Sequence, residues 1–428
     1  LQYRPLCSSG RPGLTLETAS SNTVFAGRGA QSQSSPQLNL PLETQNTPAP
    51  SLKSAKMITF LTKTAARGRA SMLGPFSTTA ATFSSSTTTF STTTTTTTMQ
   101  PRSLVSLKDL AASEINHLLD VAASLKAEYR PLKDSIPSEA LVRPNRPLEG
   151  KSMAMVFQKR STRTRVSTET GFAMLGGHPL FLGSEDIQLG TNESMLDTAR
   201  VLSRFNSIVL ARVYEHSDIE ELAQECSVPV INALSDMYHP LQILADLLTL
   251  REHVGKGKDG TDLTGLKVAW VGDGNNITHS LMVALPKLGI DLSVATPTGY
   301  EPHSDVVDLS VGFAKEAGST IHFTTDPLEA VQDADVVVTD TWVSMGQEDE
   351  YQKRMHAFAG YQVTRDMMST ANPNWKFLHC LPRKPQEVDD DVFYDEERSL
   401  VWDEAENRMW TVMAVALDLL ENKSSVQI

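Results

Sequence analysis

The fold is decided by the stretch Ser152-Met-Ala-Met-Val-Phe-Gln-Lys-Arg-Ser-Thr-Arg-Thr-Arg165. Its apolar start, 152–157, predicts a buried strand, and a helix is predicted over 164–175. The loop between them joins the carboxyl end of a strand to the amino end of a helix. Backbone N–H groups and the helix dipole make such a junction a site for anions.

This loop is basic and rich in hydroxyl groups. Its polar side chains are those of Lys159, Arg160, Ser161, Thr162, Arg163, Thr164 and Arg165. Arg163 offers a guanidinium fork that matches two phosphate oxygens. The loop is not a Walker A motif, because GxxxxGK[ST] is absent. A solvated basic turn with a capping serine is the alternative, but four cations and three hydroxyls in seven residues exceed what capping needs. The sequence therefore predicts a phosphate site.

Strands and helices alternate on both sides of this loop. Helices are predicted over 115–129, 192–205 (with Asn192 as the N-cap), 240–253, 279–288, 305–317 and 407–420, and strands over 208–213, 228–233, 267–271, 292–295, 320–324, 336–339 and 376–379. A Gly/Lys/Asp-rich linker, 255–265, divides the pattern into two runs. Two such runs predict an α/β protein with two doubly wound parallel-sheet domains joined by interdomain helices. The last helix is expected to pack back on the first domain.

The predicted organisation has four parts. Residues 1–104 form a leader, 105–250 a domain that binds the phosphate, 251–405 a second domain, and 406–428 the returning helix. The leader carries nine basic and two acidic residues, whereas the whole chain has a net charge of −13, so 105–428 carries about −20. So acidic a body is a poor match for nucleic acid or an anionic membrane.

The leader has the composition of an organellar transit peptide. The segment 57–104 contains no acidic residue and is saturated with Ser and Thr, including the run 92–98. A generic disordered tail is the alternative. We expect delivery to the mitochondrial matrix, although plastid transit peptides have similar compositions. The cysteines Cys226 and Cys380 of the body are far apart and lack CxxC spacing, which favours a reducing compartment.

The segment Trp270-Val-Gly-Asp-Gly-Asn-Asn-Ile277 raises the alternative of a dinucleotide-binding domain. That pattern fails twice. Ile277 stands where GxGxxG has its third glycine, and the next strand ends without the acidic residue that would bind a ribose hydroxyl. The asparagines instead suit a polar ligand at the strand ends. Asp340 and the pair His379-Cys380 also follow predicted strands, although each taken alone is more typical of a cap or a buried strand end.

Taken together, these segments resemble the aspartate/ornithine carbamoyltransferase family. Ser-Thr-Arg-Thr at 161–164, Leu-Ala-Arg-Val at 210–213 and His-Pro-Leu-Gln at 239–242 resemble its carbamoyl phosphate apparatus. Gly-Asp-Gly-Asn-Asn at 272–276, Asp-Thr-Trp-Val-Ser-Met-Gly at 340–346 and His-Cys-Leu-Pro at 379–382 resemble its ornithine-using members in particular. The resemblance covers about residues 105–421, and the six motifs occur in the family's order.

The resemblance implies a role for each matched residue. Carbamoyl phosphate would be bound by Ser161, Thr162, Arg163, Thr164, Arg212, His239, Gln242, Cys380, Leu381 and Arg408. Ornithine would be bound by Asn276, Asp340, Ser344 and Met345, and Arg163, His239 and Cys380 would be the catalytic residues. Gln188 would reach the active site of a neighbouring subunit in a homotrimer. The implied reaction makes citrulline and phosphate, as in arginine biosynthesis and the urea cycle.

The chemistry of these residues agrees with that implication. Attack on the carbamoyl carbon places negative charge on its oxygen, and each donor already aimed there is worth ~2.7–4 kcal/mol. Asp340 can anchor the cationic end of a diamino acid, whereas a site for aspartate needs further cations. Aspartate-using family members also carry Pro where Cys380 stands. No metal or cofactor is expected. Aspartate as the acceptor, and a non-catalytic binding or regulatory subunit, remain the alternatives.

Overall fold

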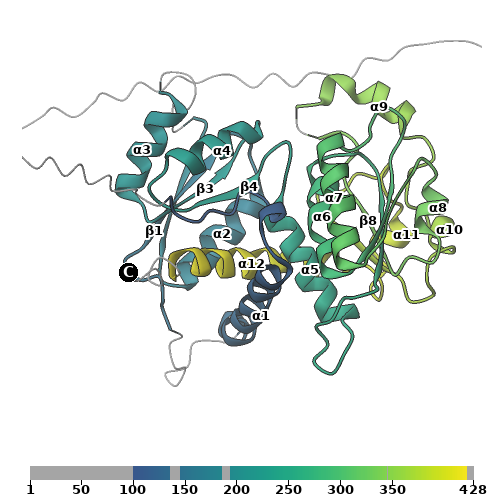
Figure 1. Cartoon of the computed structure of the whole chain (residues 1–428), viewed down its shortest axis with the longest axis horizontal. Helices are drawn as coiled ribbons and strands as arrows, with labels where there is room; N and C mark the ends of the chain where they lie inside the picture. Colours follow the sequence, from purple (N-terminus) through teal and green to yellow (C-terminus); the bar gives the residue numbers. More distant parts are fainter. Residues whose placement is uncertain (1–99, 135–144, 186–192, 345, 422–428) are drawn as a thin grey trace, which may run out of the picture. The chain divides into compact units, whose positions relative to one another are not determined.

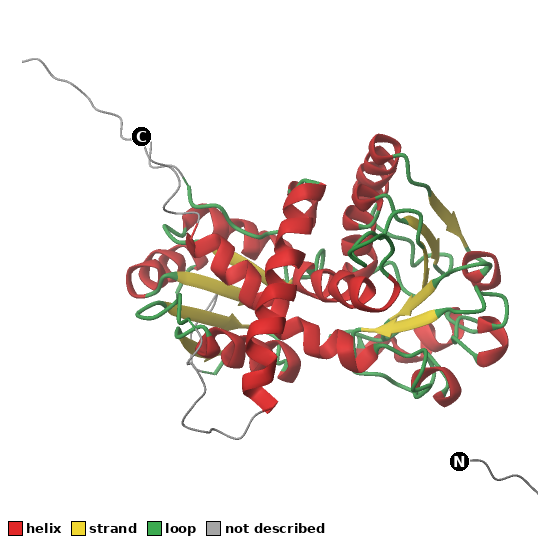
Figure 2. Ribbon diagram, turned by 90° about the horizontal axis from the view of Figure 1, so that it is seen from below, coloured by secondary structure: helices red, strands yellow, loops and turns green. Residues whose placement is uncertain are grey.

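The computed structural model describes residues 100–134, 145–185, 193–344 and 346–421 (Figure 1). The predicted leader up to residue 99 and the predicted site residues Gln188 and Met345 lie outside these ranges. Two parallel sheets form within the described part, each with helices on its faces (Figures 1 and 2). The predicted fold class, α/β with two parallel sheets, is confirmed.

The first sheet has the strand order β2-β1-β3-β4. Its strands are β1 Ser152–Phe157, β2 His178–Gly183, β3 Ile208–Arg212 and β4 Val230–Leu234. Phe157 pairs with Arg212 where β1 and β3 end, so the basic loop starts beside Arg212. Edge strand β2 was not predicted, although Leu180, Phe181 and Leu182 are apolar, because Pro179 at its start argued against a strand; none of its residues is buried in the structure.

The second sheet has the order β7-β6-β5-β8-β9. Its strands are β5 Lys267–Val271, β6 Asp291–Ala295, β7 Ile321–Thr324, β8 Val336–Thr339 and β9 Lys376–His379. In both sheets the strand order reverses beside the first strand, between β1 and β3 and between β5 and β8. Ligands of open α/β sheets bind at the carboxyl ends of the strands at such switch points. The basic loop and the Gly272–Asn276 turn both lie at these ends.

The helices connect the strands and cover the sheets. They are α1 Ala112–Asp134, α2 Thr162–Met174, α3 Met195–Phe205, α4 His216–Glu225, α5 Pro240–Val254, α6 Asn276–Ala284, α7 Ser304–Ala317, α8 Pro327–Val331, α9 Tyr351–Ala357, α10 Arg365–Met368, α11 Asp390–Phe393 and α12 Val401–Glu421, with 3-10 turns at Leu107–Asp109, Pro286–Leu288 and Glu348–Glu350. The predicted start of α3 at Asn192 is wrong. Ser194 caps this helix, because its side chain accepts a hydrogen bond from the N–H of Asp197.

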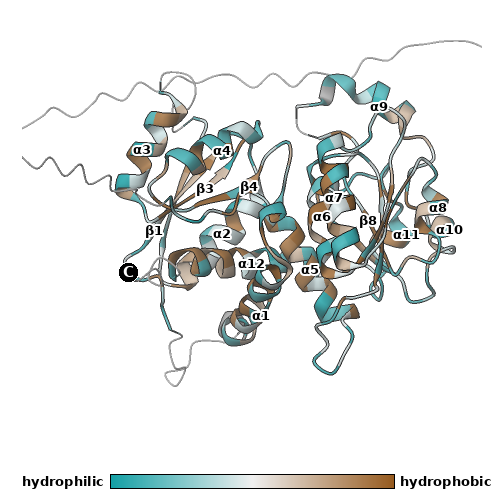
Figure 3. Ribbon diagram, in the orientation of Figure 1, coloured by the Kyte–Doolittle hydropathy of each residue, from teal (hydrophilic) through white to brown (hydrophobic). Residues whose placement is uncertain are grey.

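The helix α12 returns to the first sheet, as predicted, and packs against α1, α2 and α5 (Figure 1). It begins at Val401, six residues before the predicted start. The prediction missed this start because residues 401–406 mix acidic residues with a buried Val and show no apolar face of their own. The apolar face predicted for α1, from Ile115 to Tyr129, is buried. Hydropathy colouring shows both hydrophobic and hydrophilic residues on α5 and α12 (Figure 3). No helix in the described ranges is both long and apolar enough to span a bilayer.

Candidate active site

A cavity of about 450 Å³ opens where the carboxyl ends of the two sheets meet. Its walls come from the basic loop, from the ends of β3, β4, β8 and β9, and from the amino ends of α2, α5 and α6. Most of the predicted site residues line it, namely Ser161, Thr162, Arg163, Thr164, Arg212, His239, Asn276, Asp340, Ser344, Cys380, Leu381 and Arg408. Gln242 does not line the cavity but is buried behind it.

The amino end of α2 forms one wall. Ser161 caps this helix, because its Oγ accepts a hydrogen bond from the N–H of Thr164. Arg163, in the first turn, donates to the carbonyl oxygen of Leu381, which follows β9 of the other sheet. This bond brings the phosphate loop and the Cys380 segment together. The wall presents helix N–H groups and a guanidinium, which suit an anion.

Arg212 and Arg408 place two buried cations beside this wall, with exposures of 6% and 3%. Burial, together with the charge of Arg408, lowers the pKa of Arg212 to about 10, and burial lowers the pKa of Arg408 to about 10. Both remain protonated at pH 7. The Nε of each guanidinium has no hydrogen-bond partner among the described residues. Buried donors without partners are costly, so the site is complementary to a multivalent anion.

His239 joins this cluster as a neutral donor. It is 5% exposed, and burial with the nearby charge of Arg408 lowers its pKa well below its usual range. Its backbone N–H donates to Ser280 Oγ over 2.8 Å, which fixes the residue at the start of α5. The ring Nδ1 has no partner in the described part of the chain. A neutral imidazole of this kind can donate to a carbonyl oxygen without adding charge.

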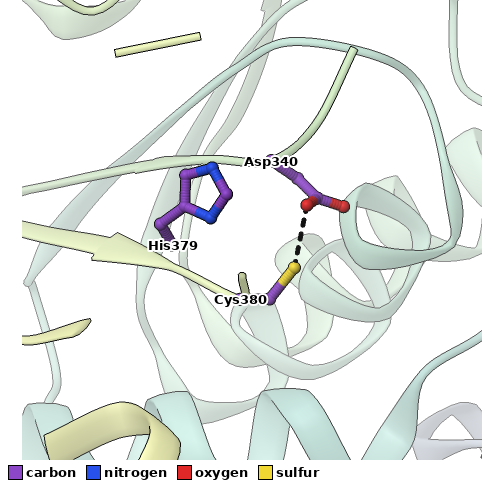
Figure 4. Close-up of side chains that lie close together, drawn as sticks. All are labelled: Asp340, His379 and Cys380. Atoms are coloured by element: carbon purple, nitrogen blue, oxygen red, sulfur yellow. Dashed lines mark hydrogen bonds between the residues drawn. The ribbon is translucent and has the colours of Figure 1, made fainter. Parts of the chain in front are cut away.

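The opposite wall holds the acidic group of the site. Cys380 Sγ donates to Asp340 Oδ1 over 2.9 Å (Figure 4). Asn275 Nδ2 donates to the other oxygen, Oδ2, over 3.3 Å, while its own side-chain oxygen caps α6. Asn276 Nδ2 donates to the carbonyl of Ser235 over 2.6 Å. Desolvation and the neighbouring Asp340 raise the pKa of the Cys380 thiol well above its usual range, so it is protonated at pH 7.

Asp340, His379 and Cys380 lie close enough together to be considered as a metal site (Figure 4). The ring of His379 argues against that use. Its Nδ1 accepts from the N–H of Leu381 over 2.9 Å, and its Nε2 bonds Glu387 over 3.2 Å, so neither nitrogen has a free lone pair. The ring instead supports Leu381, which has a left-handed φ of 60°. A non-glycine residue in this conformation needs such support.

Several lining residues were not predicted as site residues. Lys159, Lys384, Leu234, Ile277, Thr341, Val343 and Pro382 line the cavity beside the predicted ones. The two lysines were visible as charges next to the motifs, and burial and the charge of Arg212 lower the pKa of Lys159. Leu234, Ile277 and Val343 are apolar, and nothing in the sequence separates them from the core. The carboxyl pair behind the cavity, Asp246 and Glu404, was also missed.

The two walls define a class of enzyme: a transferase that binds a phosphorylated donor beside an amine acceptor, in a site with Arg163, Arg212 and Arg408 on one side and the carboxylate of Asp340 on the other. Comparison with known proteins identifies the family. The carbamoyl phosphate-binding domain of the aspartate/ornithine carbamoyltransferases matches residues 102–252, and their Asp/Orn-binding domain matches residues 264–419. The chain belongs to the aspartate/ornithine carbamoyltransferase family.

Similar proteins agree with this assignment. The mitochondrial ornithine carbamoyltransferase of Aquarana catesbeiana is 54% identical over 326 residues, which cover 76% of this chain and 89% of that protein. A crystal structure of the mitochondrial ornithine carbamoyltransferase of Coccidioides immitis has a TM-score of 0.67 and 45% identity, and covers 76% of this chain and 100% of that one. The ornithine carbamoyltransferase of Pyrococcus furiosus also has a TM-score of 0.67, with 47% identity over 74% of this chain and 96% of that one.

Proposed function

We propose that this chain transfers the carbamoyl group of carbamoyl phosphate to the side-chain amine of L-ornithine, giving L-citrulline and phosphate. One observation carries the proposal. Arg163, Arg212, Arg408 and the neutral His239 face one cavity, opposite the carboxylate of Asp340. Among the described residues, the Nε atoms of Arg212 and Arg408 and the Nδ1 of His239 are buried without a hydrogen-bond partner. The first wall fits a phosphate joined to a carbonyl group, and the second fits a cationic amino acid. The matching relatives named above are ornithine carbamoyltransferases.

The phosphate end of the donor lies, in this proposal, at the amino end of α2. The hydroxyls of Ser161, Thr162 and Thr164 bind its oxygens, together with Arg163 and Arg212. Arg163 and His239 polarise the carbamoyl oxygen, where negative charge develops during the attack. Arg408 adds a further cation, and Gln242 reaches the cavity through its hydrogen bond to Arg408. The backbone carbonyl oxygen of Leu381 would lie near the amino group of the carbamoyl moiety and accept a hydrogen bond from it.

The acceptor amine must lose its proton before it can attack. A free alkyl ammonium titrates near ~10.4, so the neutral form is a small fraction at pH 7 to 8. The positive charges of the arginines around the site lower the pKa of the acceptor's side-chain ammonium group and so favour its neutral form. In our mechanism the neutral amine attacks the carbamoyl carbon, the bond to the phosphate oxygen breaks, and the amine proton leaves with the phosphate. The protonated thiol of Cys380 takes no covalent part.

The recognition of ornithine rests on Asp340, Asn276, Ser344 and Met345. Asp340 is buried, carries the only carboxylate that lines the described part of the cavity, and is held by Cys380 and Asn275. It would bind the α-ammonium group of the acceptor. An aspartate acceptor would instead place its second carboxylate against Asp340, and like charges repel at this distance. A non-catalytic subunit would not explain why His239 is neutral and why its Nδ1 has no hydrogen-bond partner among the described residues.

We further propose a mitochondrial homotrimer. The relative from Aquarana catesbeiana is named mitochondrial, and the composition of the leader matches an imported precursor. Large apolar side chains are exposed on α2, β2 and α3, including Phe205, which is 74% exposed. Exposed apolar groups of this size favour an interface between subunits. Gln188, from the segment after β2, would then reach into the neighbouring site.

The test is an assay of the purified chain with carbamoyl phosphate. We expect citrulline with ornithine and no carbamoylaspartate with aspartate. Activity with aspartate but none with ornithine would overturn the proposed acceptor. Tight binding of carbamoyl phosphate without any turnover would favour the non-catalytic alternative.

A further inference from the structure

Two carboxyl groups lie behind the cavity, out of reach of solvent. Asp246 on α5 is 2% exposed and Glu404 on α12 is 1% exposed. Their side chains are hydrogen-bonded to each other, and burial raises the pKa of both. Two carboxylates in such a setting cannot both be ionised. The hydrogen bond between them requires a proton on at least one of the two groups.

Glu404 also accepts two hydrogen bonds from different parts of the chain. Its Oε1 accepts from Gln242 Nε2 over 2.6 Å, and its Oε2 accepts from the backbone N–H of His379 over 2.8 Å. The first partner lies on α5, beside the first sheet, and the second ends β9 of the second sheet. One carboxyl group thus joins the two sides of the cavity.

The contact with Gln242 leads to the phosphate wall. The Nε2 of Gln242 uses both hydrogens, one for Glu404 and one for Asp246 Oδ1 over 2.8 Å. Its Oε1 accepts from Arg408 over 2.6 Å, so the orientation of the amide is fixed by acceptors on one side and a donor on the other. Arg408 in turn donates to Thr164 Oγ1 over 3.3 Å.

The contact with His379 leads to the acceptor wall. His379 directly precedes Cys380, and its ring accepts from the N–H of Leu381. The carbonyl of Leu381 accepts from Arg163. The backbone N–H that Glu404 holds therefore fixes the strand end from which Cys380 and Leu381 enter the cavity.

We infer that Glu404 is a positioning residue for the transfer reaction, which sets the place of Arg408 through Gln242 and the place of the Cys380 strand end through the N–H of His379. The inference rests on the proposed function. Glu404 touches neither substrate, since it does not line the cavity. It holds the phosphate wall and the acceptor wall in a fixed position relative to each other, which a transfer between two bound substrates requires.

This role makes the two acids unequal. Glutamine at 404 has one oxygen, so it cannot accept from both Gln242 and His379, and its NH2 group must face one of these donors. Asparagine at 246 can still accept from Gln242 through its oxygen and donate to Glu404 through its nitrogen. We therefore expect Glu404→Gln to be harmful and Asp246→Asn to be mild. Glu406→Gln, on the same helix with a partly exposed pair to Arg130, is the matched control.

The experiment compares these three full-length variants with the wild type. For Glu404→Gln we expect kcat about tenfold lower and KM for carbamoyl phosphate about tenfold higher. The reason is that the new NH2 group would face another buried donor, either Gln242 Nε2 or the N–H of His379. Calorimetric titration with inorganic phosphate should show a Kd raised by a similar factor, because Arg408 is displaced. The two other variants should stay within about threefold of the wild type in all three quantities.

The outcomes separate the inference from the proposed function. A merely structural role of Glu404 lowers the amount of folded enzyme, so Vmax falls while KM and the Kd for phosphate stay unchanged, and this result would overturn the inference. Equal damage from Asp246→Asn would also overturn it. A wild-type protein that forms no citrulline would instead refute the proposed function, and the phosphate titration would still test Glu404.

Discussion

Arg163, Arg212 and Arg408 come from three elements that are far apart in the sequence, and they meet at one cavity. For Arg163→Ala we predict kcat lower by about 10²–10³, because one donor to the developing charge is lost along with a phosphate contact. Steady-state citrulline assays measure this. Arg165→Ala is the control, since Arg165 lies outside the cavity, pairs with Glu169 and should leave kcat within about threefold. Equal losses in the two variants would argue against the assigned role of Arg163.

Cys380 offers a second test at this scale. Its thiol is protonated and donates to Asp340, so Cys380→Ser keeps a donor at the same place. We predict a decrease in kcat/KM for ornithine of about tenfold or less, with KM for carbamoyl phosphate unchanged. Complete loss of activity, with folding intact, would mean that the sulfur takes part in the chemistry.

The sequence predicted the cavity-lining polar residues well, because they cluster in short motifs beside recognisable strands. Ser161 to Thr164 and His379 to Leu381 belong to such motifs. It did not predict the contacts behind them. Gln242 and Glu404 are 162 positions apart, and only the packing of α12 on α5 brings them together. A buried carboxyl pair has no local pattern, since a lone acid in a helix usually faces solvent.

At the scale of elements, two helices begin with the same type of cap. Ser161 caps α2 and Ser194 caps α3, each accepting from the N–H three residues on. We predict that Ser161→Ala and Ser194→Ala each lower the free energy of unfolding by about 1 kcal/mol. Only Ser161→Ala should also raise KM for carbamoyl phosphate, by about tenfold, because its helix end faces the cavity. Urea unfolding and kinetics test both, and a matching rise in KM for Ser194→Ala would show that the Ser161 cap has no particular role in binding carbamoyl phosphate.

The helix α6 carries a pH-sensitive anchor. His279 donates from Nδ1 to the carbonyl of Met237 and accepts at Nε2 from the N–H of His303, so it must be neutral. Burial lowers its pKa from 6.5 to about 4. Because the unfolded chain takes up the proton first as pH falls, this stabilisation is present above pH 6.5 and is lost toward pH 4, by about 3 kcal/mol.

The variant His279→Gln measures that contribution. It should be less stable than the wild type at pH 7, and the difference in free energy of unfolding should shrink by about 3 kcal/mol by pH 4. A difference that stays constant over this range would show that His279 does not titrate as its burial implies.

The strands predicted with correct bounds are those whose apolar residues are buried. Strands β1, β5, β8 and β9 are buried and short, and their bounds were predicted correctly. The edge strand β2 has no buried residue, and the first turn of α12 is acidic. The spacing of apolar residues along the sequence indicates which face of an element is buried. It says little about segments whose structure depends on contacts with residues far away in the sequence.

At the scale of the whole molecule, the proposed trimer shares its sites between chains. We predict that mixing Arg163→Ala with a variant in which 188–191 is replaced by a Gly/Ser linker restores partial activity after dissociation and reassembly. Some interfaces of the hybrids then pair an intact segment with an intact phosphate site. Hybrids that reassemble yet stay inactive, or a fully active monomer, would rule out shared sites.

The proposed reaction is a direct transfer from carbamoyl phosphate to ornithine within this cavity. The most direct measurement follows citrulline from labelled carbamoyl phosphate while the mass of the intact protein is recorded in the same samples, with and without ornithine. We expect labelled citrulline only when ornithine is present, and a protein of unchanged mass throughout. No citrulline, or a protein heavier by one carbamoyl group before ornithine is added, would contradict it.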